Sequence, residues 1–113
     1  MNIRTIHQGF SVSTQILPAD MDEIAAKGFR AIICNRPDGE DPGQPPAAEI
    51  AAAAAAAGLG FAHVPVCPGT ETPDDAQAMA RALAALPGPV LAFCRSGNRS
   101  VCLAQMADSQ RTD

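Results

Sequence analysis

Short apolar runs alternate with helix-forming stretches along this chain, and the alternation limits the possible folds more than any other feature. Four runs have the length and composition of β-strands, at residues 10–13, 30–34, 61–66 and 89–93. Helical signals fill the intervals between them. Alternating strands and helices are typical of α/β domains with a mostly parallel sheet. We therefore predict a small, mostly parallel sheet of about four strands flanked by helices.

The composition of each run refines this prediction. The run at 10–13 alternates apolar and polar side chains and is a candidate edge strand. The run at 30–34 is apolar throughout its centre, which predicts a strand covered on both faces. Proline near the start and glycine near the end frame most helical stretches. The predicted helices cover residues 18–28, 47–58 and 72–86, and a last helix begins near Arg99.

Length and charge exclude several classes of protein. At 113 residues the chain has room for one domain, spanning residues 1–113. Its net charge of −4 disfavours binding to the phosphate backbone of nucleic acids. The longest apolar run, 51–59, is too short to span a membrane, and the N-terminus has no apolar signal core. Four cysteines without a secretory context favour reduced thiols. We expect a cytoplasmic protein without nucleic-acid or membrane partners.

The segment with the most chemical information joins the last predicted strand to the last helix. It reads Cys94-Arg95-Ser96-Gly97-Asn98-Arg99-Ser100. A loop in this position turns several backbone N–H groups toward one point and binds anions. Gly97 permits the backbone angles that such a tight turn needs. We predict an anion-binding loop whose substrate contacts are Arg95, Ser96, Gly97, Asn98 and Arg99.

Four side chains of this loop have candidate roles. The positive field of the loop favours the thiolate form of Cys94, which makes it a candidate nucleophile. The planar guanidinium of Arg99 can bind two oxygens of a tetrahedral oxyanion. Ser100 can donate a hydrogen bond to the sulfur and make it a better leaving group. Arg95 has two interpretations, as a residue that steers substrate or as a solvated loop charge.

The chain resembles two known families. Four residues separate Cys94 from Arg99, and this loop resembles the active-site loop of rhodanese-type sulfurtransferases. Over nearly the full chain, a series of segments resembles the phosphatase-like domain of beta-lactamase hydrolase-like proteins. That bacterial family is related in fold to dual-specificity protein phosphatases. The matching segments are residues 8–15, 35–40, 63–66 and 94–100.

The second resemblance implies a cysteine phosphatase-like fold and the hydrolysis of phosphate esters through a cysteinyl-phosphate, without a metal or another cofactor. Cys94 would attack phosphorus, the loop and Arg99 would bind the equatorial oxygens, and Ser100 would assist breakdown of the intermediate. Arg36, in a matching segment, is a further candidate substrate contact. The implied partners are a small anionic substrate and a metallo-beta-lactamase-like hydrolase in functional association. His7 and His63 belong to no paired metal-ligand motif.

The general acid is the least determined part of this mechanism. The segment after the third predicted strand, 67–70, lacks the aspartate that such phosphatases often use. Loops that follow neighbouring parallel strands converge at the carboxyl end of a sheet. Asp38 and Glu71 are therefore the candidates, ahead of Asp74, whose expected role is helix capping. An equal alternative is that Asp38 only forms a turn before Gly39.

Three functions remain open. The near full-length resemblance and the anion-binding loop favour a cysteine-dependent phosphatase. The short loop favours a rhodanese-like sulfurtransferase with a Cys94 persulfide, because the usual phosphatase loop has five residues between cysteine and arginine. A non-catalytic anion-binding or sensor module is the third hypothesis.

The other cysteines raise a separate question. Cys34, Cys67 and Cys94 each end a predicted strand, so up to three thiols can face one site. One interpretation is coincidence and small apolar packing. The other is that Cys34 or Cys67 forms a reversible disulfide with oxidised Cys94. Cys102 lies beside apolar residues of the last helix and is predicted to pack.

Overall fold

The computed structural model describes residues 1–110, and side chains up to residue 108. Its centre is a five-stranded sheet in the order β1-β2-β5-β3-β4. The strands are β1 (Ile3–His7), β2 (Phe10–Ser13), β3 (Ala31–Cys34), β4 (Gly60–His63) and β5 (Val90–Phe93). Among these described strands, β1 and β2 form the one antiparallel pair. The predicted mostly parallel α/β sheet is confirmed, with one strand more than expected.

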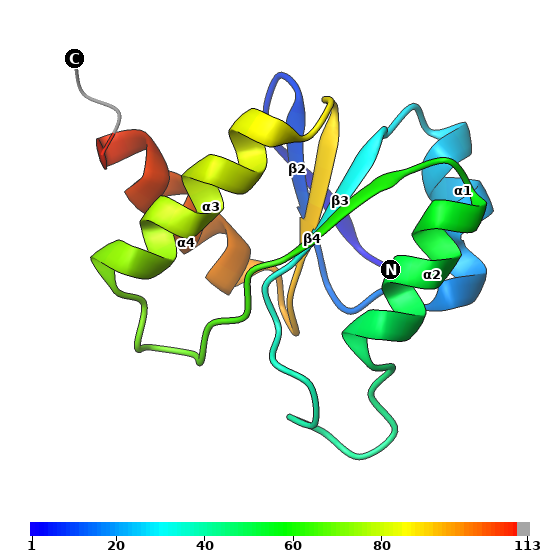
Figure 1. Cartoon of the computed structure of the whole chain (residues 1–113), viewed down its shortest axis with the longest axis horizontal. Coiled ribbons are helices and arrows are strands. Elements are labelled where there is room, and N and C mark those ends of the chain that lie inside the picture. Colours follow the sequence, from blue (N-terminus) through cyan, green and yellow to red (C-terminus); the bar gives the residue numbers. More distant parts are fainter. Residues whose placement is uncertain (111–113) are drawn as a thin grey trace.

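Helices cover both faces of the sheet (Figure 1). They are the 3-10 turn η1 (Pro18–Asp20), α1 (Met21–Ala26), α2 (Ala47–Ala56), α3 (Pro73–Ala85) and α4 (Asn98–Gln110). The paired helices α3 and α4 lie on one face, and α1 and α2 lie on the other (Figure 1). Because successive strand residues point to opposite faces, Ile33 and Ala92 pack under α3 and α4, whereas Ile32 and Leu91 pack under α1 and α2.

The prediction that residues 10–13 form an edge strand is wrong. β2 lies between β1 and β5, and all four of its residues are buried. Its serines belong to the interior: Ser13 Oγ, for example, donates to the carbonyl of Thr14 at 2.8 Å. The edge strand is β1, whose residues are mostly exposed and which forms an antiparallel hairpin with β2. The polar alternation in β2 therefore reflects serines in the interior and not a solvated face.

The remaining element boundaries differ from the predictions by small amounts, except in β4. This strand ends at His63, although residues 61–66 were expected to be strand. Beyond its end, Val64 N still donates to Cys34 O at 2.8 Å, and Val66 N donates to Asn35 O at 3.2 Å. The chain thus stays beside β3 without regular pairing. No helix in the described part of the chain is long and apolar enough to cross a membrane.

Candidate active site

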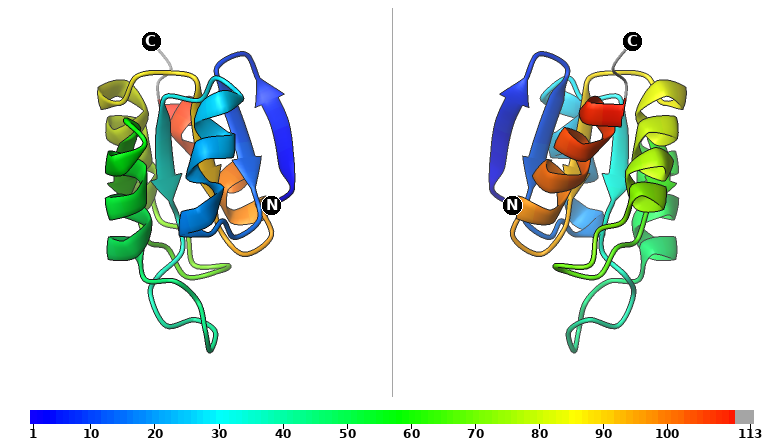
Figure 2. Two further views of the ribbon diagram at one scale, coloured as in Figure 1. Left: turned by 90° about the vertical axis from the view of Figure 1, so that its right-hand side faces the viewer. Right: turned by 90° about the vertical axis from the view of Figure 1, so that its left-hand side faces the viewer.

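The parallel strands bring three loops to one end of the sheet. Cys34 is in register with both His63 of β4 and Phe93 of β5. The loops that follow these strands therefore leave at the same edge, which we call the carboxyl end (Figure 2). One of them is the long loop of residues 35–46. The predicted convergence of loops is confirmed.

The turn after β5 holds Cys94 in a buried position. Its residue exposure is 1%, and its backbone N–H donates to Ser13 O at 3.3 Å. The Gly97 N–H donates to Cys94 Sγ at 3.0 Å, and α4 begins at the next residue, Asn98. Gly97 has φ +93°, a conformation that L side chains rarely adopt, and a Cβ there would lie 2.8 Å from Arg4 Nη2.

The Arg99 side chain points from α4 into the same region and is almost fully buried. Its Nη1 donates to Glu40 Oε2 at 3.0 Å, Val66 O at 2.9 Å and Asn35 O at 3.4 Å, and Nη2 lies 3.3 Å from Glu40 Oε1. Within the described chain, Arg99 Nε and Ser100 Oγ are buried and have no hydrogen-bond partner. Buried donors without partners are rare, and an absent ligand is one physical reason for them.

Arg36 is held inside the loop that follows β3. Its Nε lies 2.8 Å from Glu40 Oε1, Nη1 donates to Gln15 Oε1 at 2.8 Å, and Nη2 pairs with Asp41. Burial lowers the pKa of Arg36, but the hydrogen bonds from these carboxylates outweigh it, so the pKa is raised. The Asp41 carboxylate also lies 3.5 Å from Nε of Arg95, whose side chain is 72% exposed. Sequence reasoning gave no role to Glu40 or Asp41. Both follow the Asp-Gly turn, and Glu40 ends the matching segment 35–40.

The two candidate acids occupy different surroundings. Asp38 is exposed, and its Oδ1 accepts the N–H of Ala47 at 2.8 Å, at the start of α2. Glu71 shares a cavity of about 310 Å³ with Arg99. The complete lining is Pro68, Gly69, Glu71, Ser96, Asn98, Arg99 and Cys102. The structure thus brings Glu71 to the arginine and engages Asp38 elsewhere.

The cysteines differ in accessibility. Cys34 is buried beside Cys94 and donates to Arg36 O at 3.4 Å; burial raises its pKa to about 11. Cys67 is exposed. Cys102 is only half-buried and lines the cavity, so the prediction that it packs is incomplete. In the described part of the chain no group of three or more His, Cys, Asp or Glu residues could hold a metal ion.

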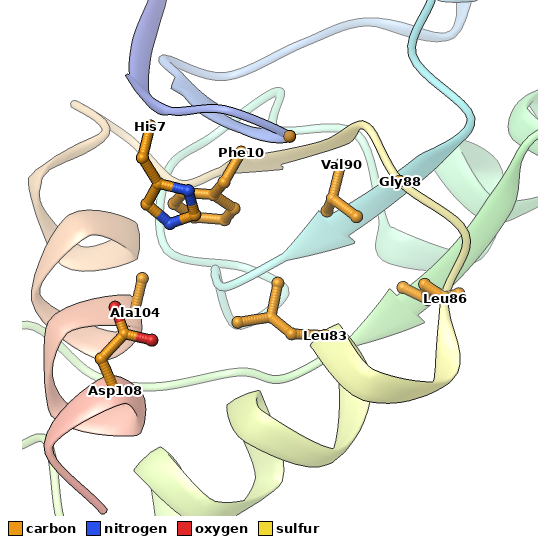
Figure 3. Close-up of a pocket in the computed structure, with 9 residues that line it drawn as sticks. His7, Phe10, Leu83, Leu86, Gly88, Val90, Ala104 and Asp108 are labelled. Carbon is orange, nitrogen blue, oxygen red and sulfur yellow. The ribbon is translucent and has the colours of Figure 1, made fainter. Parts of the chain in front are cut away.

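A second cavity lies at the opposite end of the sheet, which we call the amino end (Figure 3). It has a volume of about 200 Å³ between the first residues of β2 and β5 and the helices α3 and α4. Figure 3 shows apolar side chains around it, with His7 and Asp108 on one side. Among the described residues it is lined by His7, Gly9, Phe10, Leu83, Leu86, Gly88, Val90, Ala104 and Asp108, which include no cysteine and no arginine.

Comparison with known proteins identifies the family. The model of the family described as beta-lactamase hydrolase-like protein, phosphatase-like domain, matches residues 2–111. The chain belongs to this family. The beta-lactamase hydrolase-like protein of Agrobacterium fabrum is 36% identical over 113 residues, and that of Xylella fastidiosa strain Temecula1 is 39% identical over 108. Each match covers 96% of this chain but only 26% and 25% of those relatives, so the chain spans about a quarter of their length.

Solved structures agree with the phosphatase-like domain. A candidate phosphatase from Neisseria meningitidis is 33% identical, with a TM-score of 0.88, and the match covers 100% of this chain and 80% of that one. The core catalytic domain of the PP-IP phosphatase Siw14 from S. cerevisiae shares the fold, with 14% identity and a TM-score of 0.65. That match covers 98% of this chain and 65% of the yeast domain. The predicted cysteine phosphatase-like fold is confirmed.

Proposed function

We propose that this phosphatase-like domain hydrolyses phosphate esters of small anionic substrates through a cysteinyl-phosphate on Cys94. One observation carries the proposal: the buried Cys94 sulfur accepts the Gly97 N–H, and the next helical turn supplies two buried donors that have no partner among the described residues, Arg99 Nε and Ser100 Oγ. A phosphoryl group bound in the turn would give the guanidinium donor a partner. The Ser100 hydroxyl, which makes no hydrogen bond in the described chain, would have to turn toward the sulfur or the bound phosphoryl group to gain one.

Each atom of the reaction has a place in this scheme. The Cys94 thiolate attacks phosphorus, the S–P bond forms, and the P–O bond to the leaving group breaks. The leaving oxygen takes a proton from an acid, for which Glu71 is the better placed candidate because it shares the cavity with Arg99. Water then attacks phosphorus and gives one proton to the carboxylate that had protonated the leaving group, and the S–P bond breaks so that the sulfur leaves as a thiolate that accepts a hydrogen bond from Ser100.

The short loop supports a second candidate. With four residues between Cys94 and Arg99, a rhodanese-like sulfurtransferase would use the same loop N–H groups to hold a persulfide. The Cys94 thiolate would attack the outer sulfur of thiosulfate and release sulfite. Cyanide would then take that sulfur as thiocyanate.

Two assays on three proteins separate these functions. We expect wild type to hydrolyse p-nitrophenyl phosphate slowly, with losses of more than about a thousandfold in Cys94→Ser and about a hundredfold in Arg99→Ala. Thiocyanate formed from thiosulfate and cyanide, and lost in Cys94→Ser, would instead support the sulfurtransferase. Hydrolysis that survives Cys94→Ser would contradict the mechanism. Equal phosphate binding by wild type and Cys94→Ser without any turnover would support the non-catalytic module.

A further inference from the structure

Glu40 lies between two buried arginines that come from different parts of the chain. Its Oε1 is 2.8 Å from Arg36 Nε and 3.3 Å from Arg99 Nη2, and its Oε2 is 3.0 Å from Arg99 Nη1. The arginine side chains are 3% and 7% exposed, and that of Glu40 is 20% exposed. Without this carboxylate, two positive charges would face each other away from water. Removing one partner of such a group is strongly unfavourable.

Burial raises the pKa of the Glu40 carboxyl, but the hydrogen bonds from Arg36 and Arg99 outweigh it, so this pKa lies below its ordinary value. Glu40 is therefore ionised at neutral pH. The two carboxylate oxygens meet the two terminal nitrogens of Arg99 in a fork-to-fork contact. This geometry fixes the plane of the guanidinium as well as its position.

The three guanidinium nitrogens of Arg99 differ in their hydrogen bonding within the described chain. Glu40 and the carbonyls of Val66 and Asn35 take Nη1 and Nη2, and Nε is left as a buried donor without a partner in the described chain. We propose that Glu40 is a positioning residue for Arg99: it holds the guanidinium so that Nε, which has no partner in the described chain, donates to the substrate anion. The proposal rests on the function proposed above.

The chain offers a matched control in the neighbouring Asp41. It lies in the same loop and pairs with Arg36 and Arg95, but no hydrogen bond or ion pair joins it to Arg99 in the described chain. Glu40→Gln keeps the shape of the side chain and removes its charge, and Asp41→Asn does the same next to it. If the charge of the loop matters only in general, both substitutions should change phosphate binding alike. If Glu40 positions Arg99, only Glu40→Gln should change it.

The test measures the binding of inorganic phosphate by calorimetry, in parallel with kcat and KM for p-nitrophenyl phosphate. We expect Glu40→Gln to bind phosphate about tenfold more weakly and Asp41→Asn to stay within about twofold of wild type, since only the first variant should weaken the charged hydrogen bond from Arg99 Nε to phosphate. In ¹⁵N-labelled protein, the Nε–H signal of Arg99, assigned by its loss in Arg99→Lys, should shift with phosphate in wild type and shift less in Glu40→Gln.

Several results would overturn the proposal. If Glu40→Gln binds phosphate as tightly as wild type, the carboxylate does not position Arg99, and tighter binding would mean that it competes with the substrate. If Glu40→Gln does not fold, Glu40→Asp keeps the charge but shortens the reach; unchanged phosphate binding there counts against positioning, and weaker binding supports it. Failure of the proposed function looks different: the order of phosphate affinities would hold, but no variant and no wild type would turn over substrate.

Discussion

The two ends of the sheet share the same strands but have opposite chemistry. At the carboxyl end, Cys94 of the loop after β5 and Arg99 and Ser100 of the first turn of α4 are buried, and the loop after β3 adds the ion pair of Glu40 with Arg99. At the amino end, β5 and β2 begin beside an apolar cavity whose ionisable residues, His7 and Asp108, are exposed. The strands supply rigidity to both ends. The difference comes from the chain direction, because only the carboxyl end receives the N-terminus of α4, the positive end of the helix dipole.

This comparison also corrects what the net charge implies. The chain carries −4 overall, yet Arg4, Arg36, Arg95 and Arg99 lie at or near the carboxyl end, where Glu40 and Asp41 partly neutralise them. Local charge therefore decides whether a small anion binds. The global charge remains a reason against extended polyanions.

The largest expected contrast between the two ends comes from two glycines with similar backbone angles. Gly97 (φ +93°) lies beside Cys94, and Gly28 (φ +97°) follows α1 at the amino end. Alanine at either position should lower the free energy of unfolding by about 1–2 kcal/mol, because of the left-handed conformation. Only Gly97→Ala displaces the N–H that meets the sulfur, so it should lower phosphatase activity by about a hundredfold.

Urea denaturation and p-nitrophenyl phosphate hydrolysis, measured on both variants, provide the check. Space around the new methyl group differs between the sites: it meets Arg4 Nη2 at Gly97, and nothing within 4 Å at Gly28. Arg4 Nη2 is at the flexible end of an exposed side chain and can move. Equal activity of the two variants would show that the turn does not need its backbone geometry for catalysis.

The local part of the fold and site could be predicted from the sequence. A turn such as that from Cys94 to Asn98 is built by its own backbone, with Gly97 in the one conformation that demands glycine, so its residues are sufficient to identify it. The same holds for α3, where Thr72 and Asp75 cap each other's backbone N–H groups. Such features depend on neighbours within a few residues.

Features that depend on the path of the chain could not be predicted. β1 is short and exposed, and only its pairing with β2 makes it a strand. Among the acids of loop 35–46, the sequence favours Asp38, but the loop turns so that Asp38 binds the start of α2 and Glu40 meets Arg99. No local pattern distinguishes these carboxylates, because their partners lie 9 and 59 residues away along the chain.

A second prediction concerns pH and the buried thiol of the carboxyl end. Burial raises the pKa of Cys34 from 9.0 to about 11 in the folded protein. Between these two pH values the folded state keeps the Cys34 proton, whereas the unfolded chain loses it. The contribution of Cys34 to the free energy of unfolding is therefore complete below pH 9 and is lost as the pH rises toward 11. Between pH 8 and pH 10, wild type should lose about 1 kcal/mol more stability than Cys34→Ala.

Urea midpoints at the two pH values test this, with Cys67→Ala as the control at an exposed thiol. The control should follow wild type. A Cys34→Ala protein with the pH dependence of wild type would mean that the thiol is already solvated. The burial of Cys34 also affects the disulfide hypothesis, because a protonated thiol attacks oxidised Cys94 slowly. Peptide mapping after mild peroxide would detect whether Cys34 or Cys67 forms a disulfide with Cys94.

The smallest expected effect compares the two ends of a single helix. Asn98 begins α4 at the candidate site, and Asp108 lies in its last turn at the amino end. Asn98→Asp adds a negative charge at the positive end of the helix dipole, and Asp108→Asn removes one from the negative end. Both changes should therefore raise stability slightly, by about 0.3–1 kcal/mol. They should differ in phosphate binding, which calorimetry measures.

The new carboxylate of Asn98→Asp would repel phosphate and attract Arg4, whose Nη2 already donates to Asn98 Oδ1 at 3.2 Å. One exposed charge is worth about 1 kcal/mol at close range in water, so phosphate affinity should fall about fivefold. Asp108→Asn should leave phosphate affinity unchanged, because the whole length of α4 separates it from Cys94. Added salt should reduce the first effect, since exposed charges are screened. If both variants bind phosphate like wild type, the anion does not sit at the N-terminus of α4.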